Sequence, residues 1–149
     1  MRELIYAMRF RGQASPVEGR PGVLKATTSA PSCTLTSLIG PDGLSGVVQP
    51  AAGGSASFES TVEFIGESAF KESGSIAFGK GEHRLRFSTV GEGYLGGSPD
   101  PKVSHGTVMW RVDGGDGQFA GARGLITSNF TVDDVGAVVD NHFGLLWVE

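Results

Sequence analysis

A chain of 149 residues, 39% hydrophobic and 19% charged, has the size and composition of one globular domain and not of a disordered chain. Its 24 glycines follow no Gly-X-Y repeat, which excludes collagen and favours many tight turns. The net charge of −4 provides no basic surface, so neither nucleic acid nor an anionic membrane is expected as a partner.

The first segment predicts a half-buried strand because its residues alternate between apolar and polar side chains. Its apolar face consists of Leu4, Tyr6, Met8 and Phe10. Charges at Arg2, Glu3 and Arg9 interrupt the apolar residues, so neither a signal peptide nor a membrane span of about 18 apolar residues fits. We therefore expect a cytoplasmic location, with which the single cysteine, Cys33, is compatible.

Alternating or β-branched segments recur along the rest of the chain, and none shows a convincing helical period. They lie at residues 23–30, 33–39, 58–65, 68–78, 82–90, 103–112, 124–132 and 137–148. Small residues and turn formers predict a loop over residues 40–57, with a short strand at Val47 and Val48 as the alternative, and a second loop over 91–101. The pattern predicts an all-β fold in a single domain, residues 1–149. We expect an antiparallel β-barrel of eight or nine strands with little or no helix, because closure removes the exposed edges of so long a meander.

One motif, GTVMWRVDGGDGQFAGARG at residues 106–124, reads as strand, glycine turn, strand. It resembles the signature turn of the allene oxide cyclase and dirigent barrels and of bacterial lipocalin-like (calycin-type) relatives. The matching residues are Gly114, Gly115, Gly117, Phe119, Gly121 and Gly124. The resemblance implies a barrel in which Phe119 plugs one end and an apolar cavity guides the cyclisation or coupling of a reactive substrate. The printed sequence departs from the dirigent pattern, because its single cysteine cannot form an internal disulfide and no secretion signal is expected in its first segment.

Three residues are candidates for acid–base chemistry. His105 and His142 lie within strands, and histidine is the usual proton carrier near neutral pH. Tyr6 lies on the apolar face of the first predicted strand. A phenol buried there needs a hydrogen-bond partner and can donate to an oxygen of a ligand. For each of these residues, a structural role is the alternative. Glu63 and Glu72 also lie within strands. Glu63 is expected to face outward, because the adjacent residues Val62 and Phe64 are expected to face the core.

Aromatic side chains are the candidate walls of the cavity. Phe64, Phe87, Trp110 and Phe130 are expected to hold the ligand, and Tyr94 is expected to cover it from the second loop. Across the last hairpin, Asn129 is expected to lie opposite Asp140, either as a structural pair or pointing into the cavity. No His-x-His pair occurs, so the sequence predicts no metal site and requires no cofactor.

These features leave three functions open. The first is a cofactor-independent isomerase, cyclase or lyase acting on a small hydrophobic molecule in the cavity. The second is a lipocalin-like carrier or sensor, and the third is a filled barrel that serves as an oligomeric module. The last strand is apolar on both faces, with Phe143 and Leu145 against Leu146 and Val148, which favours a homo-oligomer.

Overall fold

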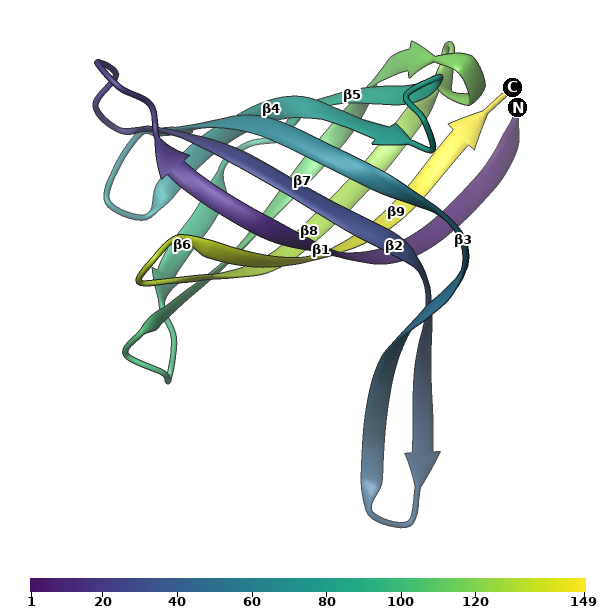
Figure 1. Ribbon diagram of the computed structural model, residues 1–149, viewed down its shortest axis with the longest axis horizontal. Helices are drawn as coiled ribbons and strands as arrows, with labels where there is room; N and C mark the ends of the chain where they lie inside the picture. Colours follow the sequence, from purple (N-terminus) through teal and green to yellow (C-terminus); the bar gives the residue numbers. More distant parts are fainter.

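The computed structural model, which describes residues 1–149, is built almost wholly of strands (Figure 1). The elements are β1 (Arg2–Pro16), β2 (Val23–Gly40), β3 (Gly43–Phe64), β4 (Ala69–Phe78), β5 (His83–Thr89), β6 (Gly93–Gly97), β7 (Val103–Asp116), the 3-10 turn η1 (Gly117–Phe119), β8 (Arg123–Asp133) and β9 (Ala137–Val148). No helix has the length and hydrophobicity to cross a bilayer. The predicted all-β class is confirmed.

All nine strands belong to one antiparallel sheet in the order β3-β2-β1-β9-β8-β7-β5-β4-β6. An additional pairing between β3 and β4 closes eight of them into a ring, which confirms the predicted barrel. The ninth strand, β6, pairs with both β4 and β7. It lies inside the segment that the sequence predicted as a loop, where Gly93, Gly96 and Gly97 suggested turns.

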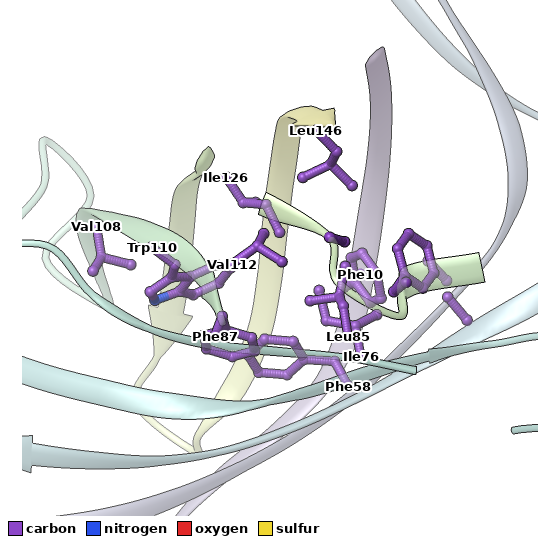
Figure 2. Packing of buried hydrophobic residues seen from close by; sticks show 14 of the residues in the cluster. Phe10, Phe58, Ile76, Leu85, Phe87, Val108, Trp110, Val112, Ile126 and Leu146 are labelled. Carbon is purple, nitrogen blue, oxygen red and sulfur yellow. The ribbon is translucent and has the colours of Figure 1, made fainter. Parts of the chain in front are cut away.

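The inside of the barrel is filled by aromatic and aliphatic side chains (Figure 2). Alternation places every second residue inward, so Phe10 of β1, Phe58 of β3 and Trp110 of β7 come from strands far apart in the sequence and meet in the interior. The ring of Phe87 stacks on Phe58 with centroids 5.4 Å apart and lies 4.3 Å from the Trp110 ring. The predicted inward face of β1 is confirmed, because Phe10 is fully buried and Leu4, Tyr6 and Met8 pack against the core.

The glycine turn after β7 closes one end of the barrel. Gly114, Gly117 and Gly121 adopt positive φ angles of 81°, 60° and 70°, which few other residues tolerate. The turn folds η1 back so that Phe119 is buried against Phe78, with ring centroids 5.2 Å apart. Phe119 therefore occupies the end of the barrel, as the motif implied.

The second hairpin is longer than the sequence suggested. Residues 33–50, which we call the arm, leave the barrel as a two-stranded ribbon at the ends of β2 and β3 (Figure 1). The prediction of a loop over residues 40–57 is wrong, because residues 43–50 pair with residues 33–40, from Gly40↔Gly43 to Cys33↔Pro50. The alternative of a strand at Val47 and Val48 is confirmed, and that strand is longer than predicted. The arm separates from β1 at Pro31, whose nitrogen has no hydrogen to donate to a β ladder, and the pairing of β2 with β1 accordingly ends at Ser29.

Candidate functional site

A small cavity of about 50 Å³ lies at the end of the barrel opposite Phe119. Most of its wall is apolar, with Phe58, Phe64, Phe70, Leu95 and Phe130 among its lining residues. Three polar side chains also line it, namely Thr28 of β2, Glu72 of β4 and Asp140 of β9. The cavity is thus an apolar cup with two carboxyl groups, and its volume is enough for a few water molecules or a small organic group.

Glu72 is held in the wall by hydrogen bonds to both oxygens. Ser60 Oγ donates to Glu72 Oε2 at 2.5 Å, and Trp110 Nε1 donates to Oε1 at 3.2 Å. The backbone N–H of Glu72 donates to Thr89 Oγ1 at 2.7 Å, and this bond fixes β4 against β5 at this point. The carboxyl group is therefore held by hydrogen bonds from two strands, β3 and β7, while β5 holds the backbone of the same residue.

Burial raises the pKa of Glu72 from 4.5 to about 7, because an apolar environment disfavours the charged form. The hydrogen bond from Ser60 opposes this rise, the negative charge of Asp140 adds to it, and the bond from Trp110 opposes it again. Desolvation is the largest of these effects. A carboxyl group with this pKa can both give and accept a proton near neutral pH.

Asp140 and His142 form the second polar group of the interior. Ser128 Oγ donates to Asp140 Oδ1 at 2.5 Å, and His142 Nε2 lies 2.9 Å from Asp140 Oδ2. The imidazole ring stacks on Phe10 with centroids 4.2 Å apart and meets the edge of Trp110 at 5.1 Å. His142 is therefore fixed behind Asp140, on the side away from the cavity, where it can hold the carboxylate in place.

Three buried polar atoms have no hydrogen-bond partner, namely Tyr6 Oη, Thr28 Oγ1 and His142 Nδ1. Such atoms are rare in folded proteins, since each costs about 1–3 kcal/mol when it is left unpaired. Among them, Thr28 lines the cavity beside Glu72 and Asp140. Its hydroxyl is available to a molecule that enters the cup.

The structure brings six of the residues predicted from the sequence into the interior, but in different roles. Phe64 and Phe130 line the cavity, whereas Phe87 and Trp110 belong to the packed core beside it. Tyr6 lies further along the barrel, where its ring packs against Phe78 and burial raises the pKa of its hydroxyl. These five residues and His142 belong to one connected barrel interior, and the cavity lies at one end of it.

The other three predicted residues lie outside. The side chains of Tyr94, His105 and Asn129 are exposed and, with Phe130, line an open depression of about 380 Å³ across β6, β7 and β8. His105 and Asn129 do not face the barrel interior, because each lies on the outward-facing set of its strand, so neither takes the cavity role that was one of its two predicted alternatives. Tyr94 lies on the outer wall and does not cover the cavity.

Sequence reasoning missed Glu72 and Asp140 as the central pair. Glu72 alternates with Phe70 and Ile76, both buried, so its inward direction was readable from the period of the strand. The sequence predicts Asp140 opposite Asn129, but the register pairs Asp140 with Phe130 and Asn129 with Asn141. The two side chains therefore lie on opposite faces of the sheet, with Asp140 buried and Asn129 exposed. Glu63 is exposed, as predicted.

No protein-family model matches the chain, and no curated protein matches it. Among solved structures, the chain is similar to the pterocarpan synthase dirigent protein GePTS1, with a TM-score of 0.52 and 16% sequence identity. The alignment covers 98% of this chain and 86% of that one. The barrel has a dirigent-like fold. At this identity the likeness establishes the architecture alone.

Proposed function

We propose that the dirigent-like barrel binds a small, largely apolar molecule at its open end and holds a polar group of that molecule against Glu72. The observation that carries this proposal is a buried carboxyl group with a pKa of about 7 in the wall of an apolar cavity. A carboxyl group that served only to stabilise the fold would be costly in this position, because its ionised form is desolvated.

Proton exchange would follow from the environment of Glu72. When protonated, Glu72 donates to a carbonyl or ether oxygen of the ligand, and when ionised it accepts a proton from a hydroxyl group or an acidic carbon. Ser60 accommodates both forms, because a hydroxyl group can donate to the carboxylate or accept from the carboxylic acid. Asp140 keeps the site electrostatically unfavourable for a second negative charge, which favours neutral ligands over anionic ones.

The size of the cavity limits what enters it. Ligand sites for drug-sized molecules usually occupy about 300–1,000 Å³, and the cup holds about 50 Å³. The proposed ligand therefore places one small group inside and leaves its remainder at the mouth. Leu95 of β6 lines the cavity, and β6 is a short strand, so displacement of β6 would admit a larger group.

The dirigent-like fold supports a substrate-directing role, in which an apolar wall fixes the conformation of a reactive molecule and one acid–base group assists. GePTS1 is described as a pterocarpan synthase. For the present chain, we propose a neutral substrate with a hydroxyl or carbonyl group and an isomerisation, cyclisation or elimination that needs a proton transfer and no cofactor.

Titration with small phenols and cyclic ketones, followed by two-dimensional ¹H–¹⁵N and methyl NMR, tests the proposal. We expect chemical-shift changes at Val62, Leu95 and Val138, which line the cavity. Affinity for the probes should change with a midpoint near pH 7 in the wild type. The Glu72→Gln variant should bind the same probes without that pH dependence.

Two variants provide the controls. Ala26→Leu places extra atoms in the cavity and should weaken probe binding, whereas Glu63→Gln removes an exposed carboxylate and should leave binding and its pH profile unchanged. The proposal fails if no probe perturbs the cavity residues, or if the perturbations are confined to the outer depression around His105.

A further inference from the structure

The arm presents one apolar face. Pairing places Cys33 opposite Pro50, Leu35 opposite Val48 and Ile39 opposite Leu44, and these three pairs share the same side of the ribbon. Asp42, at the tip, is the arm's single charged residue. Ser37 opposite Gly46 interrupts these pairs, and the other face carries Leu38 and Val47 among polar residues. The face with the three pairs is therefore the more apolar of the two.

The arm is exposed in the single chain. Ile39 is 90% exposed and Leu44 is 76% exposed, and no residue from Pro31 to Ser55 is buried. Figure 1 shows the ribbon running away from the barrel, so its tip has no surface of its own chain to pack against. A two-stranded ribbon in water is at best marginally stable, and long apolar strands with free edges are usually covered in native proteins.

A second unpartnered apolar surface lies on the outside of the barrel. The wall patch consists of Ile5, Met109, Leu125, Phe143, Leu145 and Trp147, each between 36% and 58% exposed. The register places Ile5, Leu145 and Leu125 side by side across β1, β9 and β8. Near the base of the arm, Leu35 and Phe143 line an open groove of about 750 Å³, so the wall patch can be approached from outside.

We propose that two copies of this chain exchange arms, so that the apolar face of each arm packs on the wall patch of the other copy. Each arm face is about 27 Å long and about 10 Å wide, from the rise and spacing of β-strands. Packing it on a wall buries about 500 Å² when both surfaces are counted, and two reciprocal arms bury about 1,000 Å², the lower bound for a specific interface. A one-way contact would bury half of that area, so the reciprocal dimer is the arrangement that the surfaces favour.

A lipid surface is the less suitable partner for the arm. The ribbon has free backbone N–H and C=O groups along its edges, and these cannot be satisfied in hydrocarbon. It also carries no Lys, Arg, Trp or Tyr to anchor it among lipid headgroups. The sheet of a second copy supplies an apolar wall without requiring the edges to be desolvated.

Measurement of mass by light scattering after gel filtration tests the proposal at micromolar concentrations. The wild type should have twice the chain mass of 15.5 kDa. The Ile39→Ser/Leu44→Ser variant should dissociate at least about tenfold more readily, because it loses anchor residues of the interface. The matched control is Leu38→Ser/Val47→Ser, which removes exposed apolar side chains from the opposite face of the arm and should remain dimeric.

A disulfide trap distinguishes exchange from self-packing. In a Cys33→Ser background, copies carrying Ile39→Cys are mixed with copies carrying Leu145→Cys and oxidised. A disulfide between the two copies supports the proposal, and a pair with Leu38→Cys in place of Ile39→Cys should react far less. A monomeric or trimeric wild type, a dimer that survives the loss of Ile39 and Leu44, or arm-dependent flotation of a monomer with phosphatidylcholine vesicles would overturn it.

Discussion

Glu72 is a carboxyl group that the protein prefers to keep uncharged. Its pKa of about 7 exceeds its ordinary value of 4.5, so between these two pH values the folded chain binds a proton that the unfolded chain releases. The stabilising effect of the protonated group is therefore fully present below about pH 4.5 and declines as the pH rises to about 7. The direction is opposite to that of a salt-bridged carboxylate, whose contribution is lost at low pH.

The Glu72→Gln variant should remove this pH dependence, because glutamine has nearly the same shape and does not ionise. Above pH 7 we expect the variant to be more stable than the wild type, by an amount on the order of 3 kcal/mol if the whole shift of the pKa is expressed. Below pH 5 the two proteins should be similar. Urea unfolding at pH 5 and pH 8 measures this, and Glu63→Gln should leave both values unchanged.

Position 144 has no room for a side chain, because the ring of Tyr6 lies against the Cα of Gly144. A Cβ at this position would collide with three atoms of that ring, and Tyr6 is itself packed against Phe78. We expect Gly144→Ala to destabilise the protein by about 1–3 kcal/mol, the usual cost of overpacking a core. Gly97→Ala is the matched control, because a Cβ there meets no atom within 4 Å. Equal urea midpoints for the two variants would contradict this account of Tyr6.

At the scale of residues, the sequence predicted interior aromatic groups better than polar ones. Phe64 and Phe130 line the cavity as expected, because large apolar side chains mark the inward face of a strand. His105 and Asn129 could not be placed reliably from the sequence, since a polar residue fits either face and a register error of one reverses the assignment. The raised pKa of Glu72 depends on burial contributed by several strands, which no local pattern records.

At the scale of elements, the turn around η1 is the feature that seals the barrel. Phe119 is 3% exposed and belongs to the same core cluster as Phe10 and Trp110. The glycines of the turn allow the chain to reverse tightly enough for this side chain to enter the barrel end. The seal leaves the opposite end as the route to Glu72.

The Phe119→Ala variant should lose about 3–5 kcal/mol of unfolding free energy, as is usual when a buried phenylalanine is truncated. Tyr94→Ala removes an aromatic ring that is 49% exposed and should cost much less. Chemical unfolding of both variants at the same pH gives the comparison. A small effect at Phe119 would mean that the barrel end can close without its ring.

Element boundaries were predictable where the alternation is strict. The predicted last strand, 137–148, coincides with β9, and its inward side chains are buried from Val138 to Val148. The first strand of the arm is predicted over residues 33–39, but the second falls in a predicted loop. Gly43, Gly46 and Pro50 lie within that second strand and Pro41 precedes it, and these residues normally mark loops. An exposed ribbon packs on no core, so its strands need no alternation of apolar and polar residues. The pattern by which strands are predicted is therefore weak in the arm.

At the scale of the whole molecule, the barrel and the arm are separable. The arm contributes no buried residue, and its two strands come together at the pair Cys33↔Pro50. Replacing residues 34–49 by a two-residue Asn-Gly turn should therefore change the unfolding free energy per chain by less than about 1 kcal/mol, the range usual for surface changes. Urea unfolding at low protein concentration measures this value. Loss of the folded state would show that the arm is needed to form the barrel.

The pairing of β1 with β9 brings residues 2 and 148 together at the plugged end (Figure 1). A short linker from residue 149 to residue 1 would therefore join the chain into a circle without disturbing the sheet, and new ends could be opened at Pro41 and Asp42. The circular permutant would display any fused domain at the tip of the ribbon. A fusion at residue 1 or 149 would instead sit at the sealed base, leaving the mouth beside Glu72 free for ligand assays.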